Sequence, residues 1–162
     1  MTELEKINYR VCFTGHRPEK LTRNKIDIQN VLEIQIKQAN KKGRYVYISG
    51  MARGVDIWAA QIVLKLKDSG YPLKLICACP YDGFEKNWSY SWQMQYRDIL
   101  KSADLVKYIC KDYSRYCFQI RNKWMVDHSS MVISVFNGKK SGTKNTIDYA
   151  EKLNIPIIFI NG

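Results

Sequence analysis

The chain has 162 residues, of which 46% are hydrophobic and 25% are charged, with 26 Lys and Arg against 15 Asp and Glu. This length is typical of one domain, and the composition excludes a wholly disordered chain. The formal net charge of +11 suits a partner that carries phosphate, nucleic acid included.

The apolar residues form six short runs separated by amphipathic stretches. We predict strands at 9–14, 45–49, 73–78, 105–109, 131–136 and 156–160, and helices around 28–39, 55–66, 88–102, 125–126 and 147–153. Strands and helices alternate from end to end, which favours an α/β fold with helices on both faces of the sheet. We therefore expect a three-layer Rossmann-like sandwich with a mostly parallel central sheet, and residues 1–162 as one domain.

The chain shows no sign of secretion or of membrane insertion. Residues 1–10 lack the apolar core of a signal peptide, and no run approaches the roughly 18 apolar residues of a membrane span. The five cysteines contain no C-x-x-C pair, which favours free thiols in a reducing compartment. We expect a soluble cytoplasmic protein that binds no membrane.

Three predicted strand ends carry residues suited to ligand binding, which in open parallel sheets occurs beyond the carboxyl ends of the strands. The first strand is followed by a tight turn with polar donors, at Thr14, Gly15, His16 and Arg17. The second ends in two glycines that bracket small residues before a helix, at Ser49, Gly50, Met51, Ala52, Arg53, Gly54 and Asp56. The third such end, after the fifth strand, brings Ser141, Gly142 and Thr143 to a helix start.

Glycines at a helix start let backbone N–H groups approach a phosphate. Arg53 adds a guanidinium for a charge-assisted contact, and Asp56 suits either a helix cap or a ribose hydroxyl. Since the three ends converge on one sheet edge, we predict a pocket for a nucleotide-like ligand. Residues 1–44 supply +5 of the net charge, much of it on the first long helix and its ends, where a solvated face explains it, and the rest is spread thinly.

The motifs CFTGHRP at 12–18, SGMARGVD at 49–56, RNKWMVD at 121–127 and SGTKNTIDYA at 141–150 resemble the YpsA-like family of the SLOG superfamily. Relatives there include DNA-processing protein A and the LOG-type, lysine-decarboxylase-like phosphoribohydrolases. The resemblance implies a Rossmann-like fold that binds a nucleotide or a related ligand such as NAD, ADP-ribose or AMP. It adds Arg121, four residues before Met125, to the candidate ligand-binding residues.

The sequence departs from the LOG-type pattern at the position of the catalytic glutamate, which is Thr146 here. Cleavage of an N-glycosidic bond needs a carboxylate to act on water or on the developing cation. We therefore expect a binding or sensing domain without catalysis, and we assign no catalytic residue. Two alternatives remain: single-stranded nucleic-acid binding, as in DNA-processing protein A, and a phosphoribohydrolase that uses Asp56 and Arg121.

Other side chains carry weaker signals. Trp88, Trp92 and Tyr96 recur every four residues, which predicts an aromatic stripe on a helix, and Phe84 follows the third strand where it could border the pocket. The two histidines, His16 and His128, have no metal-ligand spacing, so we expect no metal site. The sequence does not fix the ligand's identity, and a homo-oligomer remains open.

Overall fold

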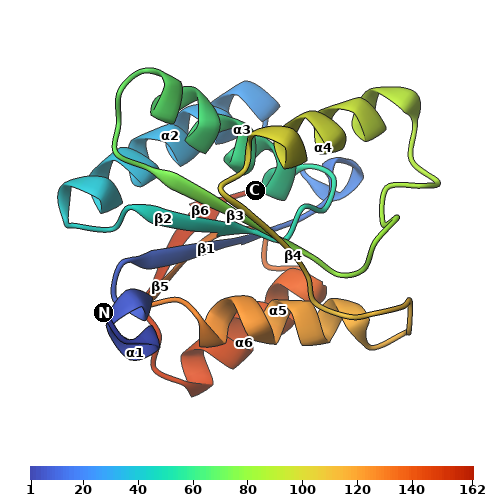
Figure 1. Cartoon of the computed structure of the whole chain (residues 1–162). Helices are drawn as coiled ribbons and strands as arrows, with labels where there is room; N and C mark the ends of the chain where they lie inside the picture. The colour runs from blue at the N-terminus through green and yellow to red at the C-terminus, as the bar shows by residue number, and fades with distance from the viewer.

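The computed structural model describes residues 1–162 and is built around a six-stranded sheet in which every pairing is parallel (Figure 1). The strands are β1 (Arg10–Gly15), β2 (Val46–Ser49), β3 (Lys74–Cys79), β4 (Leu105–Tyr108), β5 (Met131–Phe136) and β6 (Ile157–Asn161). Their spatial order is β4-β3-β2-β1-β5-β6. The chain therefore builds outward from β1 to one side and then crosses back to add β5 and β6 on the other.

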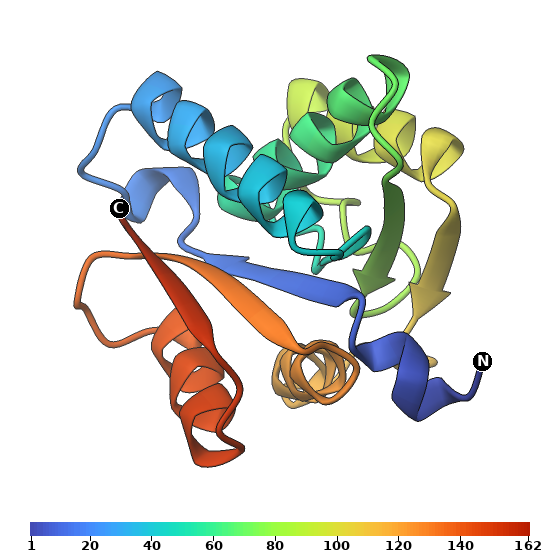
Figure 2. The same ribbon diagram turned by 90° about the vertical axis from the view of Figure 1, so that its left-hand side faces the viewer.

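Helices cover both faces of the sheet and complete the three layers (Figure 2). One face carries α2 (Lys25–Lys41), α3 (Val55–Asp68) and α4 (Tyr90–Ser102), and the other carries α5 (Cys117–Asp127) and α6 (Gly142–Lys152). Two short elements that the sequence pattern did not predict are α1 (Glu3–Ile7) and a 3₁₀ turn at Pro18–Lys20. The prediction of a three-layer α/β sandwich is confirmed.

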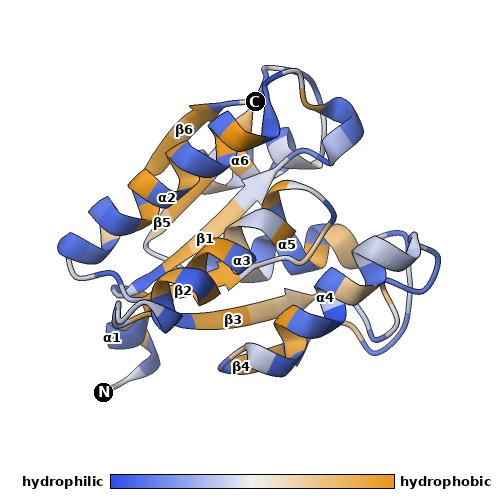
Figure 3. Ribbon diagram, turned by 90° about the horizontal axis from the view of Figure 1, so that it is seen from above, coloured by the Kyte–Doolittle hydropathy of each residue, from blue (hydrophilic) through white to orange (hydrophobic).

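The pleat of each strand divides the apolar core into two layers. Val11 and Phe13 of β1 pack with α2, α3 and α4, whereas Cys12 between them packs with α5 and α6. Cys77 and Cys79 face the same layer, as expected for residues two apart in a strand. Figure 3 shows mainly apolar strands at the centre and helices in which polar and apolar residues alternate. Burial on both sides explains why these strands read as nearly continuous apolar runs.

One detail of the prediction was wrong, and one property of the sheet was not predicted. Trp88 precedes α4 and is not part of it, so the three aromatic residues do not form one helical stripe, although the Trp88 ring packs edge-on against Tyr96 at 5.4 Å. β4 is an apolar run but lies at the edge of the sheet, where Leu105 and Tyr108 are 50% and 44% exposed. The period of an apolar run does not reveal which strand is outermost.

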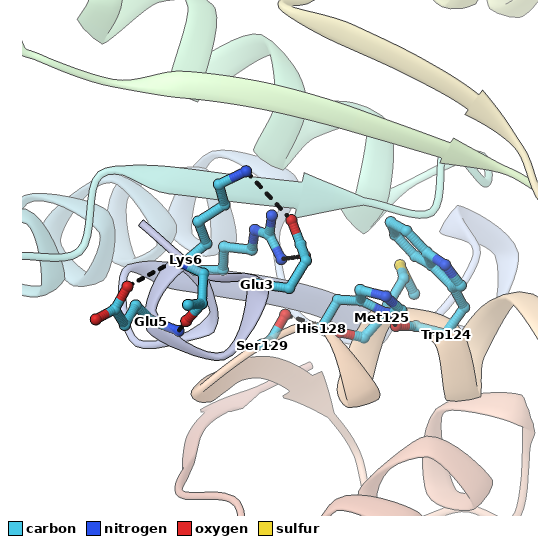
Figure 4. Close-up of polar contacts among 9 residues, drawn as sticks. Glu3, Glu5, Lys6, Trp124, Met125, His128 and Ser129 are labelled. Atoms are coloured by element: carbon cyan, nitrogen blue, oxygen red, sulfur yellow. Dashed lines mark hydrogen bonds and ion pairs between the residues drawn. The ribbon is translucent and has the colours of Figure 1, made fainter.

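The amino-terminal edge of the sheet is held by local polar contacts (Figure 4). Thr2 and Glu5 form a capping box at the start of α1, and Glu3 binds both Lys6 and Arg10. Nearby, at the end of α5, His128 donates from Nδ1 to the Trp124 carbonyl oxygen at 2.7 Å. His128 therefore lies at the edge of the sheet opposite His16, which follows the end of β1.

None of the helices combines the length and apolar character that a bilayer span needs.

Candidate functional site

A cleft opens at the carboxyl edge of the sheet, beside the point between β1 and β5 where the order of the strands reverses. Its volume is about 350 Å³, within the range of small-molecule sites. Open parallel sheets place ligands at such a switch point. The lining residues are Thr14, Gly15, His16, Arg17, Lys20, Ala52, Arg53, Asp56, Phe84, Trp88, Phe118, Arg121, Asn122, Met125, Ser141, Gly142 and Thr143.

The turn from β2 into α3 forms one side of the cleft and is tightly folded. Met51 is buried with φ of +62°, and Gly54 has φ of +90°. Gly54 has no room for a side chain, because a Cβ atom there would lie 2.8 Å from the His16 carbonyl oxygen. Ser49 fixes the turn from below, since its Oγ donates to the Asp56 carbonyl oxygen at 2.8 Å and accepts from the Met51 N–H.

Gly15 brings β1 against the start of α3. A Cβ atom on Gly15 would lie 2.5 Å from the Cβ of Val55, so a larger residue would push the helix away from the sheet. This close approach places the start of α3 directly beside the β1 exit. The N–H groups of Arg53 and Gly54 donate no hydrogen bond within the protein. Arg53 lines the cleft, so its N–H suits an anion at this helix start.

The start of α6 forms the other side of the cleft. Ser141 caps the helix by accepting from the Lys144 N–H, and the N–H groups of Gly142 and Thr143 have no partner within the protein. The helix dipole adds a partial positive charge at the same place. Two helix starts with unpaired donors therefore border one cleft.

A buried carboxylate and a buried guanidinium form its floor. Asp56 and Arg121 are each 5% exposed. Asp56 Oδ2 accepts from the Ala52 N–H at 3.3 Å, while Oδ1 is buried without a hydrogen-bond partner. Arg121 donates to the Gly50 carbonyl oxygen and, at 2.8 Å, to Asn122 Oδ1. Burial raises the pKa of Asp56 to about 6, and the Arg121 charge opposes that rise.

His16 ties the β1 exit to the β5 exit. Its Nε2 accepts from the Asn137 backbone N–H at 3.3 Å, and the Asn137 side chain donates to the Lys20 carbonyl oxygen at 2.9 Å. Burial, with a smaller contribution from Lys20, lowers the pKa of His16. The imidazole is therefore neutral at pH 7, with its proton on Nδ1.

Charge at the mouth of the cleft is mainly positive. Arg17 is exposed, and Arg53 is half-buried; both guanidinium groups approach Glu19 Oε1, at 3.9 Å and 3.1 Å. Lys20 also lines this region. With Arg121 on the floor, four cationic side chains and one carboxylate, Asp56, line the cleft, so its charge favours an anionic ligand.

Aromatic side chains close the remaining side. Phe84, Trp88 and Phe118, here called the aromatic wall, line the cleft. Phe84 packs edge-on against Trp88 at 5.0 Å and lies 5.7 Å from Phe118. Such faces offer a stacking surface to a planar group such as a nucleobase.

The structure brings together most of the residues singled out from the sequence. Eleven predicted positions line the cleft: Thr14, Gly15, His16, Arg17, Ala52, Arg53, Asp56, Arg121, Ser141, Gly142 and Thr143. Ser49, Gly50, Met51 and Gly54 lie behind it and shape the β2–α3 turn. Lys20, Phe118 and Asn122 line the cleft but were missed, because a single Lys, Phe or Asn in an amphipathic context gives no signal.

The fold and the cleft define a Rossmann-like protein of the SLOG type, with a site at the exits of β1, β2 and β5. Residues 11–161 match the profile of the YspA SLOG family. The chain belongs to that family.

Two relatives give the scale of the sequence likeness. The SPbeta prophage-derived protein YoqJ of Bacillus subtilis is 36% identical over 124 residues, covering 69% of this chain and 72% of its own. UPF0398 protein OB1025 of Oceanobacillus iheyensis is 30% identical over 149 residues, covering 86% of this chain and 80% of its own.

Solved structures share the fold at lower identity. DNA processing protein A from Helicobacter pylori, described for its mode of binding single-stranded DNA, has a TM-score of 0.69 at 20% identity, covering 99% of this chain and 68% of its own. DNA processing protein A from Streptococcus pneumoniae has a TM-score of 0.68 at 18% identity, covering 96% of this chain and 51% of its own. The Moco carrier protein of Chlamydomonas reinhardtii has a TM-score of 0.54 at 15% identity, covering 94% of this chain and 76% of its own. At these identities the likeness shows the fold alone.

Proposed function

We propose that this protein binds a small phosphorylated ligand derived from a nucleotide, such as AMP, ADP-ribose or NAD, in the cleft. The observation that carries the proposal is the convergence of two helix starts with unpaired N–H groups on the cleft, at Arg53 and at Gly142–Thr143. Helix N-termini stabilise phosphate through these N–H groups and through the helix dipole.

Two further features fit a nucleoside attached to that phosphate. The aromatic wall borders the cleft and suits a base. Asp56 Oδ1 is a buried acceptor without a partner, and a buried polar atom left unpaired costs roughly 1–3 kcal/mol. A ligand hydroxyl, such as that of a ribose, would satisfy it.

We propose binding without cleavage. Thr146 stands where the LOG-type enzymes have their glutamate, and its hydroxyl donates to the Gly142 carbonyl oxygen at 3.0 Å within α6. Thr146 is 2% exposed and does not line the cleft. No carboxylate therefore reaches the ligand from α6, and the role that fits is recognition or sensing.

Thermal unfolding in the presence of AMP, ADP-ribose and NAD tests the proposal. A ligand at 100 times its dissociation constant adds about 2.7 kcal/mol to the free energy of unfolding, which is a clear shift in melting temperature. Lys20→Gln, which removes a cation from the cleft, should reduce the shift. Lys42→Gln removes the same charge at the far end of α2 and should not. Failure of all three ligands to raise the melting temperature would refute the proposal.

Single-stranded nucleic acid is the second candidate, favoured by exposed aromatic and basic residues between β4 and α5. Tyr113 and Tyr116 are 64% and 56% exposed, and the Arg115 guanidinium lies 4.7 Å from the centre of the Tyr116 ring. Bases stack on such side chains while Lys and Arg neutralise phosphates. Affinity for an oligonucleotide should then fall steeply with salt and should drop in Tyr116→Ala. Weak binding with little salt dependence would dismiss this candidate.

A further inference from the structure

Glu19 lies at the mouth of the cleft between two arginines that belong to different strand exits. Arg17 follows β1 and Arg53 follows β2, and the Glu19 carboxylate is 3.9 Å from the Arg17 Nε and 3.1 Å from the Arg53 Nη2. Both arginines line the cleft, whereas Glu19 does not. The carboxylate therefore neutralises, from outside, two cations that face the space where a ligand would bind.

The ion pairs hold Glu19 only weakly. The Glu19 and Arg17 side chains are 51% and 52% exposed, and exposed ion pairs contribute roughly 0–1 kcal/mol because water screens them. An anionic group entering the cleft can replace the carboxylate at little cost. It would also meet the unpaired N–H group of Arg53, which Glu19 leaves unused.

This cluster is distinct from the start of α6. The exits of β2 and β5 are separated by β1 in the sheet, and two strand spacings amount to about 10 Å. The start of α6 and the start of α3, beside which Arg53 lies, are therefore separate groups of donors. The cleft thus contains two places for an anion, and Asp56, which also lines it, keeps Oδ1 as a buried acceptor without a partner.

We propose that Arg17, Arg53 and the start of α3 form a second anion subsite, that the Glu19 carboxylate neutralises its two arginines in the free protein, and that the ligand carries at least two phosphate groups. The inference rests on the proposed function and assigns the first phosphate to the start of α6. Glu19 then acts as an internal competitor of the second phosphate. Once a ligand displaces it, the two arginines favour diphosphate ligands over monophosphates.

Titration calorimetry with AMP and ADP, which differ by one phosphate group, tests the inference. Wild-type protein should bind ADP more tightly than AMP. Glu19→Gln keeps the side chain's size but removes the competing charge, so ADP should bind about 3- to 10-fold more tightly, with AMP unchanged. Arg53→Gln should weaken ADP binding and bring the two affinities together.

The matched control is Glu33→Gln. Glu33 also contacts two cations, Lys65 at 2.8 Å and Lys37 at 3.4 Å, but it lies on α2 away from the cleft. The same change in net charge there should leave both affinities unaltered. Equal affinities for AMP and ADP in the wild type, or an ADP affinity that Glu19→Gln does not raise, would overturn the second subsite while leaving the proposed function intact. Absence of binding by either nucleotide would overturn both.

Discussion

Asp56 and Arg121 face each other across Gly50 without forming an ion pair. A Cβ atom on Gly50 would lie 3.0 Å from Asp56 Oδ2 and 2.9 Å from Arg121 Nη1. The guanidinium instead donates to the Gly50 carbonyl oxygen, and the carboxylate keeps one oxygen free of partners. The absence of a side chain at Gly50 therefore lets two opposite charges share the floor of the cleft without neutralising each other completely.

Gly50→Ala should destabilise the protein, because the added methyl group presses on two buried charged groups. Overpacking of this kind costs roughly 1–3 kcal/mol, to be measured by urea unfolding. Gly142→Ala is the control, since a Cβ atom there meets nothing within 4 Å and alanine suits a helix better than glycine. An equal loss of stability in both variants would show that crowding around Gly50 is not the cause.

The raised pKa of Asp56 makes a prediction about pH. Burial lifts it from 3.8 to about 6, so between pH 4 and pH 6 the folded state binds more protons than the unfolded state does. The free energy of unfolding should fall across this window as pH rises, by about 3 kcal/mol from this group. Asp56→Asn should lack this component, and the difference between the pH profiles of the two proteins isolates it from the other carboxylates. Parallel profiles would contradict the assignment.

His16 predicts the opposite slope. Its pKa is lowered from 6.5, chiefly by burial, so the stability it contributes is present above pH 6.5 and is lost as pH falls through the lowered value. Protonated Nε2 can no longer accept from the Asn137 N–H, and the β1 and β5 exits should loosen. His16→Gln offers a neutral acceptor and should not lose this stability. NMR titration of the imidazole, with unfolding at pH 7 and pH 5, measures both effects.

How far the sequence predicts this site depends on how local each feature is. Gly15, Gly54 and Gly142 identify strand exits in the sequence because the backbone geometry of a turn depends on adjacent residues. The exits must then lie at one edge of the sheet, since the strands are parallel. Glu19 gave no signal, since its role depends on the reach of Arg53 from another loop. Phe118 was missed for the same reason: it comes from the start of α5, far along the chain from Phe84, and only packing brings the two rings together.

The edge strand β4 shows the same limit for the fold. Leu105 and Val106 resemble the buried strands in composition, yet Leu105 is half exposed because nothing pairs with β4 on its outer side. The order of strands is a property of the crossover connections and not of any single strand. The sequence therefore predicts the class of fold and the edge where the site lies, but not which elements are outermost.

Phe118→Ala should separate recognition of the base from recognition of the phosphate. Removing this part of the aromatic wall should weaken the binding of AMP by about 1–3 kcal/mol, the usual contribution of one stacked base. Ribose 5-phosphate lacks a base, so its affinity should stay the same. Calorimetric titration with both ligands measures the difference directly.

Phe159→Ala serves as the control, because Phe159 is an exposed phenylalanine on β6 that does not line the cleft. It should leave both affinities unchanged. If Phe118→Ala weakened ribose 5-phosphate as much as AMP, the ring would be supporting the shape of the cleft and not stacking on a base. The aromatic wall would then belong to the packing between the β3–α4 connection and the start of α5, and the base would have to lie elsewhere along the cleft.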